Sequence, residues 1–219
     1  MLGIVEIHLN TPPISQAEAG TLLLSARGNT RALLLAERSA LNFLGHLSGI
    51  ATLTRRWVDE ISEYETQIRD TRKTTPGFRQ LDKYAVRMGG GLNHRMTLSE
   101  SALIKDNHVA AAGGVREAFA LVKKLNPKIE VEVEVDTLDQ LREIIPLQPD
   151  LILLDNMSVA QCIQAVAMVN GRVKLEASGG LSLENAKKYA ATGVDFLAVG
   201  ALTHSAPSLD IGLDLKVEI

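Results

Sequence analysis

The segment Ile129-Glu-Val-Glu-Val-Glu-Val135 decides the fold of this chain. Its strict alternation of apolar and acidic residues predicts a β-strand, because successive side chains of a strand point to opposite faces of the sheet. Glu130, Glu132 and Glu134 then share one face, opposite the valines. A central strand of an open parallel sheet is apolar on both faces. The pattern therefore favours a barrel strand with its charged face in the lumen. The alternative is an exposed edge strand with a solvated acidic face.

Short β-type runs alternate with helical patterns on both sides of this segment. The other predicted strands are Thr66–Asp70, Ala102–Lys105, Leu151–Asp155, Val173–Ala177 and Phe196–Gly200. The predicted helices are Glu37–Ser62 (one long helix or a helix pair), Arg79–Met88, Val115–Leu125, Leu138–Ile145, Val159–Val169 and Leu183–Ala191. Repeated strand-then-helix order predicts a parallel sheet with crossover helices.

Both ends of the chain lie outside this rhythm. Residues 1–35 contain Pro12-Pro13 and no complete strand–helix unit. Leu209–Ile219 alternates apolar residues with mostly polar or small ones, which predicts a strand that follows the barrel.

Composition places the chain among ordinary globular proteins. It has 219 residues, of which 46% are hydrophobic and 22% charged. No apolar run approaches the roughly 20 residues that span a bilayer, and the N-terminus lacks the pattern of a secretory leader. Cys162 is the single cysteine, which excludes an intrachain disulfide. We therefore expect a cytoplasmic protein.

Positive charge is concentrated between Arg69 and His108. This segment has eight Lys or Arg residues against four acids, a net charge of +4 in a chain whose total is −3, so the remainder carries −7. A local basic region in an acidic protein suits a small anionic substrate better than a nucleic acid. Scattered solvated charges are the alternative for part of the set.

Three cationic motifs follow predicted strands or glycines. Arg72 and Lys73 come directly after the strand 66–70, at the rim where barrel enzymes keep their active sites. His94 and Arg95 follow Gly89-Gly-Gly91 closely, and Lys105 ends a short apolar strand. Arginine offers a planar fork to carboxylates and phosphates, and lysine offers a compact charge. For the glycine segment, a plain solvated loop is the alternative.

Two carboxylates stand near strand ends, Glu134 and Asp155. Because adjacent parallel strands end at one rim, this pair could hold Mg²⁺, which prefers few carboxylates together with phosphate oxygens of a substrate. Salt bridges to Lys105 and Lys174 are the alternative.

Glycines follow the last two predicted barrel strands, in Ser178-Gly179-Gly180 and at Gly200. Such loops commonly bind phosphate through backbone N–H groups and a helix N-terminus. The sequence therefore predicts a phosphorylated ligand.

Eight motifs in order resemble the quinolinate phosphoribosyltransferases. They are Glu37-Arg-Ser-Ala-Leu-Asn-Phe43, Leu47-Ser-Gly-Ile-Ala-Thr52, Asp70-Thr-Arg-Lys-Thr74, Asn93-His-Arg95, Ile104-Lys-Asp-Asn-His108, Glu132–Val135, Leu154-Asp-Asn156 and Glu176-Ala-Ser-Gly-Gly180. The resemblance runs from about Gly28 to the C-terminus. Each motif is weak alone, but the ordered set is specific.

The resemblance implies an α/β fold, an incomplete TIM-like barrel of about six to seven parallel strands. By this similarity, 1–35 is the truncated remnant of an N-terminal α/β sandwich domain, 36–205 is the catalytic barrel, and 206–219 is a strand that returns toward the N-terminal region. Family members are dimers or higher homo-oligomers with shared active sites. They convert quinolinate and phosphoribosyl pyrophosphate, with Mg²⁺, into nicotinate mononucleotide, CO₂ and pyrophosphate, a step of NAD biosynthesis.

The resemblance also implies a role for each site residue. Arg72, His94, Arg95 and Lys105 would hold the two quinolinate carboxylates, and Arg38 would reach into the partner subunit's site. Lys73 and Lys105 would meet pyrophosphate or nearby anions, and Glu134 and Asp155 would meet the ribose and Mg²⁺. The loops with Ser178, Gly179, Gly180 and Gly200 would bind the 5′-phosphate. Lys73, Lys105, Glu134 and Asp155 are thus the candidate catalytic residues.

Three alternatives remain at this point. One is a molybdenum-associated group of similar barrels, against which the intact motif 104–108 argues. Another is a different phosphate-binding barrel enzyme, which would not need Arg38, Arg72 and Arg95 together. The last is an inactive or regulatory truncated paralogue, because typical members carry a complete domain before the residue that corresponds to Glu37.

Overall fold

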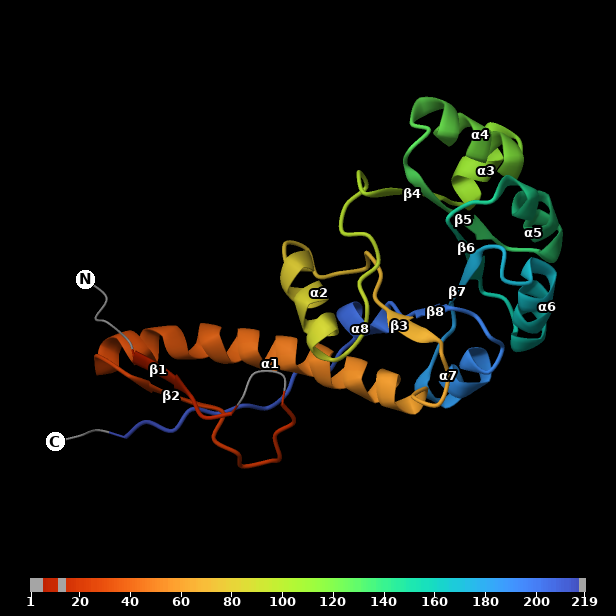
Figure 1. Cartoon of the computed structure of the whole chain (residues 1–219). Coiled ribbons are helices and arrows are strands. Elements are labelled where there is room, and N and C mark those ends of the chain that lie inside the picture. The colour runs from red at the N-terminus through yellow and green to blue at the C-terminus, as the bar shows by residue number, and fades with distance from the viewer. Residues whose placement is uncertain (1–5, 12–14, 217–219) are drawn as a thin grey trace.

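The chain forms an α/β fold built around one parallel sheet (Figure 1), as seen in a computed structural model that describes residues 6–11 and 15–216. The strands of this sheet are β3 (Gln67–Arg69), β4 (Ser101–Ile104), β5 (Glu130–Val135), β6 (Leu151–Asp155), β7 (Lys174–Ser178) and β8 (Phe196–Ala198). The helices along it are α2 (Arg79–Met88), α3 (Asp106–Ala112), α4 (Val115–Leu125), α5 (Leu138–Ile144), α6 (Val159–Val169), α7 (Leu183–Ala190) and α8 (Ala201–His204). Strands and helices predicted between residues 66 and 200 are confirmed, with ends that differ by about two residues.

The sheet is an incomplete barrel. Its six strands are ordered β3-β8-β7-β6-β5-β4, and each neighbouring pair is parallel. Leu92 adds one more rung beside β3: its N–H donates to the Ile68 carbonyl at 2.8 Å, and its carbonyl accepts from the Asp70 N–H at 3.0 Å. The predicted barrel of six to seven strands is therefore confirmed, with its open seam between β3 and β4.

Both faces of β5 are covered. Val131, Val133 and Val135 are fully buried on one face, and Glu132 on the other face is 4% exposed. Because β5 lies between β4 and β6, the alternative of a solvated edge strand is wrong. Glu132 is buried in the lumen and Glu134 is partly buried, as the alternation predicts, whereas Glu130 at the start of the strand is exposed.

Capping residues fix the starts of α5 and α6, which follow the acidic strands β5 and β6. Thr137 and Gln140 form a capping box at the start of α5, and Ser158 and Gln161 form another at the start of α6. Such reciprocal hydrogen bonds satisfy backbone N–H groups at helix N-termini. They hold the ends of β5 and β6 in a defined place at one rim.

Helix α1 (Thr30–Glu60) is a single helix that begins seven residues before the predicted Glu37. The Asn29 side chain caps it by accepting a hydrogen bond from the Ala32 N–H at 3.3 Å. Its C-terminal half packs near α2, α7 and α8, while its N-terminal half extends beyond the sheet (Figure 1).

Two segments lie outside the barrel. One is an antiparallel hairpin of β1 (Glu6–Leu9) and β2 (Leu24–Arg27), which the sequence did not predict. The other is the extended C-terminal segment, where the Leu209 N–H donates to the Gly45 carbonyl at 3.0 Å. Residues 206–216 form no strand in the structure, so the predicted C-terminal strand is not seen there, and its last residues lie outside the described part.

Among the described residues, none of the helices is both long enough and apolar enough to cross a membrane.

Candidate active site

Most of the predicted site residues gather at the C-terminal ends of the strands. Arg72 and Lys73 follow β3, Lys105 follows β4, Glu134 lies in β5, Asp155 ends β6, Ser178 ends β7, and Gly200 follows β8. The C-terminal ends of parallel strands open onto one rim, where the active sites of barrel enzymes lie. The structure therefore brings the predicted cations, acids and glycine loops to one mouth of the sheet.

Arg72 and Arg95 form a pair of guanidinium groups without an anionic partner. The Nε atoms of both side chains are buried and make no hydrogen bond. Burial lowers the pKa of Arg95, the charge of Arg72 lowers it further, and Glu132 raises it. Arg95 Nη1 donates to the Ser101 carbonyl at 2.6 Å, which holds the side chain toward the start of β4. Two neighbouring cations with unused donors are suited to a carboxylate or phosphate.

His94 joins the arginine loop to the lumen. Its backbone N–H donates to Asp70 Oδ1 at 2.8 Å, and its carbonyl accepts from Lys83 Nζ at 2.7 Å. In the ring, Nδ1 accepts from the Arg95 N–H at 2.8 Å and Nε2 lies 2.7 Å from Glu132 Oε2. Because Nδ1 accepts, the ring proton belongs on Nε2.

Asp70 and Lys83 form an ion pair in which both side chains are completely buried, at 2.5 Å. Burial raises the pKa of Asp70 and lowers the pKa of Lys83, and the charge of each partner opposes the shift of the other. Asn93, with its amide turned to suit its neighbours, donates to Asp70 Oδ2 at 2.8 Å. The pair thus fastens the 93–95 loop to the end of β3.

A second buried group lies in the lumen below the arginines. Glu176 of β7 accepts from Arg69 Nη1 at 2.7 Å, and its other oxygen is 3.7 Å from His94 Nε2. Burial and the nearby Glu132 raise the pKa of Glu176 to about 8. Glu132 and Glu176 each keep one buried oxygen without a hydrogen-bond partner.

The acidic side of the mouth lies over β4 to β6. Lys105 Nζ donates to Glu134 Oε2 at 2.9 Å, and Asn156 Nδ2 donates to Asp155 Oδ2 at 2.7 Å. Burial, with the charges of Asp155 and Asp106, raises the pKa of Asp136. Glu134 and Asp155 lie on neighbouring strands, and carboxylate oxygens are the ligand type that Mg²⁺ prefers, so these two residues would hold such an ion. In the structure, they accept hydrogen bonds from Lys105 and Asn156.

Gly179 and Gly200, which follow β7 and β8, pack closely against neighbouring residues. Gly179 has φ +87°, and a Cβ there would lie 2.1 Å from Asn156 Oδ1. A Cβ at Gly200 would lie 3.3 Å from Lys73 Cδ, so the Lys73 stem lies next to that loop. Thr203 Oγ1 donates to the Lys73 carbonyl at 2.8 Å and fixes its backbone. Lys73 is therefore adjacent to the Gly200 loop.

Arg38 stands apart from this group. It lies exposed in the N-terminal half of α1, the part of the helix that extends beyond the sheet (Figure 1).

Sequence reasoning missed the buried polar residues that support the site. They are Asp70, Lys83, Glu132 and Glu176, together with the part-buried Arg69. For Glu132 and Glu176 a signal existed, because each belongs to the polar face of a predicted barrel strand. Lys83 gave none, since a lysine in an amphipathic helix normally faces solvent.

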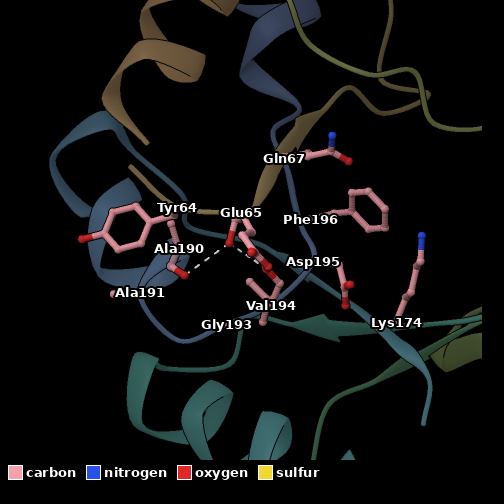
Figure 2. A pocket seen from close by; sticks show the side chains of 11 residues that line it. Tyr64, Glu65, Gln67, Lys174, Ala190, Ala191, Gly193, Val194, Asp195 and Phe196 are labelled. Atoms are coloured by element: carbon pink, nitrogen blue, oxygen red, sulfur yellow. Dashed lines mark hydrogen bonds between the residues drawn. The ribbon is translucent and has the colours of Figure 1, made fainter. Parts of the chain in front are cut away.

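A cavity of about 350 Å³ lies at the opposite end of the strands (Figure 2). Gln67, Lys174 and Phe196, the first residues of β3, β7 and β8, line it. The Thr66 hydroxyl there donates to the Val194 carbonyl at 2.7 Å, and Lys174 Nζ lies 5.4 Å from the centre of the Phe196 ring. None of the predicted site residues lines this cavity.

Residues 50–214 match the family model described as the quinolinate phosphoribosyl transferase C-terminal domain, and residues 5–48 match its N-terminal domain. The chain belongs to the quinolinate phosphoribosyltransferase family. It is 55% identical over 204 residues to the nicotinate-nucleotide pyrophosphorylase [carboxylating] of Mycobacterium leprae, an alignment that covers 92% of this chain and 72% of that protein.

Solved structures of this family have the same fold. The nicotinate-nucleotide pyrophosphorylase of Ehrlichia chaffeensis is 40% identical with a TM-score of 0.94, over 97% of this chain and 77% of that one. NadC from Streptococcus pyogenes is 42% identical with a TM-score of 0.90, over 94% and 73% respectively. Membership in this pentosyltransferase family agrees with the enzyme class expected from the eight motifs.

Proposed function

We propose that this protein transfers the phosphoribosyl group of phosphoribosyl pyrophosphate to quinolinate and releases CO₂, giving nicotinate mononucleotide and pyrophosphate. One observation carries the proposal. Arg72 and Arg95 hold two buried, unpartnered guanidinium nitrogens side by side at the mouth of the barrel. A planar dicarboxylate is the chemical complement of such a pair.

The rest of the mouth supplies the co-substrate site. Lys73 beside Gly200 and the loop Ser178-Gly179-Gly180 suit a sugar phosphate and pyrophosphate. Glu134 and Asp155 would hold Mg²⁺ together with phosphate oxygens, and the ion would neutralise the charge of the leaving pyrophosphate. Lys105, His94 and Arg95 line the quinolinate side.

The chemistry needs positioning and charge more than proton transfer. The quinolinate ring nitrogen carries no proton, so its lone pair can form the bond to the anomeric carbon while the carbon–oxygen bond to pyrophosphate breaks. The resulting pyridinium then accepts the electron pair left at C2 when the adjacent carboxylate leaves as CO₂, and a proton from solvent replaces it. The cationic side chains orient both anions and offset their charge.

We also propose that the protein works as a homodimer or larger homo-oligomer in the cytoplasm, with Arg38 entering the partner's site. Support comes from large apolar side chains that are exposed on the N-terminal half of α1, on the N-terminal segment and on the C-terminal segment. They are Ile7, Leu9, Leu22, Leu34, Leu35, Phe43, Leu209, Leu213 and Leu215. Exposed apolar side chains in such numbers favour association. Light scattering that shows only monomer at micromolar concentration would contradict this part.

An omission series tests the reaction. The protein is incubated with quinolinate, phosphoribosyl pyrophosphate and Mg²⁺, and pyrophosphate release is followed. We expect release only when all three are present, and none when nicotinate replaces quinolinate, because nicotinate lacks the second carboxylate. Release that does not depend on quinolinate would contradict the proposal.

A further inference from the structure

Within the described part of the chain, four buried side-chain atoms lack a hydrogen-bond partner, and all four belong to the site. Two are donors, Arg72 Nε and Arg95 Nε, in the side chains that the proposed function assigns to quinolinate. The other two are acceptors, Glu132 Oε1 and Glu176 Oε1, in the lumen below. Quinolinate has no N–H or O–H when both carboxylates are ionised, so it cannot satisfy the two acceptors.

The two carboxyl groups are close and fully enclosed. Glu176 has no exposed side-chain surface, and Glu132 has 4%. One carboxylate oxygen of each group and one ring nitrogen of His94 all lie within 4.8 Å of one another. Glu132 Oε2 contacts His94 Nε2 and Glu176 Oε2 accepts from Arg69 Nη1, each at 2.7 Å, which leaves Oε1 of both groups without a partner. A proton carried by one of these two carboxyl groups would give the other a donor, because a neutral carboxyl donates and a carboxylate accepts.

We propose that Glu176 is a positioning residue that carries a proton in the free protein, donates it to Glu132, and thereby sets the charge of the pocket to match a dicarboxylate. The inference rests on the proposed function, since it concerns how quinolinate is bound.

Charge counting shows what the proton does. Arg69, Arg72 and Arg95 are three cations, and the protonated Glu176–Glu132 pair carries one negative charge, which leaves two positive charges. The Asp70–Lys83 and Lys105–Glu134 ion pairs each carry no net charge, and His94 is neutral because Nδ1 accepts a hydrogen bond. Two positive charges match the two carboxylates of quinolinate. If Glu176 were ionised, only one would remain.

The surroundings of Glu176 favour its neutral form. Burial raises its pKa most, Glu132 from β5 and Asp70 from the end of β3 raise it further, and Arg69 from β3 lowers it. The flanking strands place Leu153 and Phe196 in register with Glu176, and neither residue titrates. Lys174, on the same strand and face, lies over Phe196. The result is a pKa of about 8.

The pH dependence of quinolinate binding tests this role. Both substrate carboxylates stay ionised from about pH 6.5 to about pH 9.5. We expect bound quinolinate to raise the pKa of Glu176 by about one unit, which corresponds to about a factor of ten in affinity between its protonated and ionised forms. Calorimetric titration of the folded protein should therefore show that the affinity for quinolinate weakens about tenfold from the low to the high end of this pH range. Proton uptake on binding should be greatest near pH 8.

Glu176→Gln is the decisive variant. Its amide can still donate to Glu132 and accept from Arg69, so we expect near-normal affinity at about pH 6.5 and no weakening up to about pH 9.5. Glu143→Gln, a matched change on the exposed surface of α5, should behave like the unmodified protein. Nicotinate, with one carboxylate, should bind weakly at every pH tested.

Each remaining outcome contradicts the inference. Flat affinity in the unmodified protein, or an unchanged pH dependence in Glu176→Gln, would remove the role of Glu176 while the proposed function stands. Failure of quinolinate to bind at any pH would remove both. If Glu176→Gln does not fold, the test is the number of protons that the unmodified protein takes up when it binds quinolinate. Calorimetry in buffers of different ionisation enthalpy measures this number. No proton uptake near pH 8 would overturn the proposal.

Discussion

Lys83 Nζ lies 2.5 Å from Asp70 Oδ1, and neither side chain has any exposed surface. The pair connects helix α2 to the end of β3, and through the Asp70 and Lys83 hydrogen bonds to His94 it also holds the loop that carries Arg95. A buried ion pair of this kind is therefore part of the support of the arginine pair. Substitutions at Asp70 or Lys83, which lie away from the substrate, should therefore also affect the position of Arg95.

Removing one partner of this pair should destabilise the protein strongly. We expect Lys83→Met to lower the free energy of unfolding by about 3–5 kcal/mol, because it leaves Asp70 buried without its counter-charge. Urea denaturation at neutral pH measures this change. Lys187→Met, at a half-exposed ion pair on α7, is the control and should change stability by less than about 1 kcal/mol. Similar costs for the two variants would contradict the structural role of the buried pair.

The stability of the protein should depend on pH through Glu176. Its pKa is raised in the folded state to about 8 from an ordinary value of 4.5, so the folded protein binds a proton that the unfolded chain has lost between these values. Stability contributed by this group is therefore present at low pH and falls as pH rises toward 8. Unfolding free energies from about pH 5 to about pH 8 should fall more steeply for the unmodified protein than for Glu176→Gln. Parallel curves would show that Glu176 is ionised in the folded state.

The arginine pair should determine quinolinate use. Arg72→Ala and Arg95→Ala should each lower kcat/KM for quinolinate by about 100-fold or more, with weaker binding, because each loses a bidentate donor to a carboxylate. Steady-state kinetics on purified, folded variants measure this. Arg142→Ala, which removes a surface partner of Asp139, should leave the kinetics unchanged. Near-normal kinetics in either Arg72→Ala or Arg95→Ala would remove that residue from the substrate site.

The Gly179 loop should tolerate no side chain. Gly179→Ala places a Cβ 2.1 Å from Asn156 Oδ1 and 3.0 Å from the Asn156 backbone nitrogen, at a φ of +87°. We expect affinity for phosphoribosyl pyrophosphate to fall about 10- to 100-fold, from strain of about 1–3 kcal/mol in the loop. Gly180→Ala, where φ is +61° and nothing lies within 4 Å, should have the smaller effect. Equal effects would show that contact with Asn156 is unimportant.

The strand and helix pattern of the barrel was predictable because its periodicities are strong. Alternation in 129–135 identified a lumen-facing acidic row, and the structure confirms that Glu132 lies inside. Elements without such periodicity were missed. The short α3 follows a strand directly, β1 and β2 are four residues each, and α1 starts early because Asn29 caps it.

The buried polar network of the site was beyond sequence reasoning for a different reason. Its contacts join residues far apart in the chain, such as Arg69 with Glu176 and His94 with Glu132. Strand order and register determine these contacts, and neither can be predicted from the spacing of residues within one segment. The rim residues were easier, since any residue that ends a parallel strand reaches the same mouth.

The most direct test of the account is the product of the reaction. The protein is incubated with Mg²⁺, phosphoribosyl pyrophosphate and quinolinate labelled with ¹³C in the C2 carboxylate, and the mixture is analysed by mass spectrometry. The account predicts unlabelled nicotinate mononucleotide and an equal amount of ¹³CO₂. Folded protein that binds both substrates and forms neither product, or that forms a nucleotide which retains the label, would contradict it.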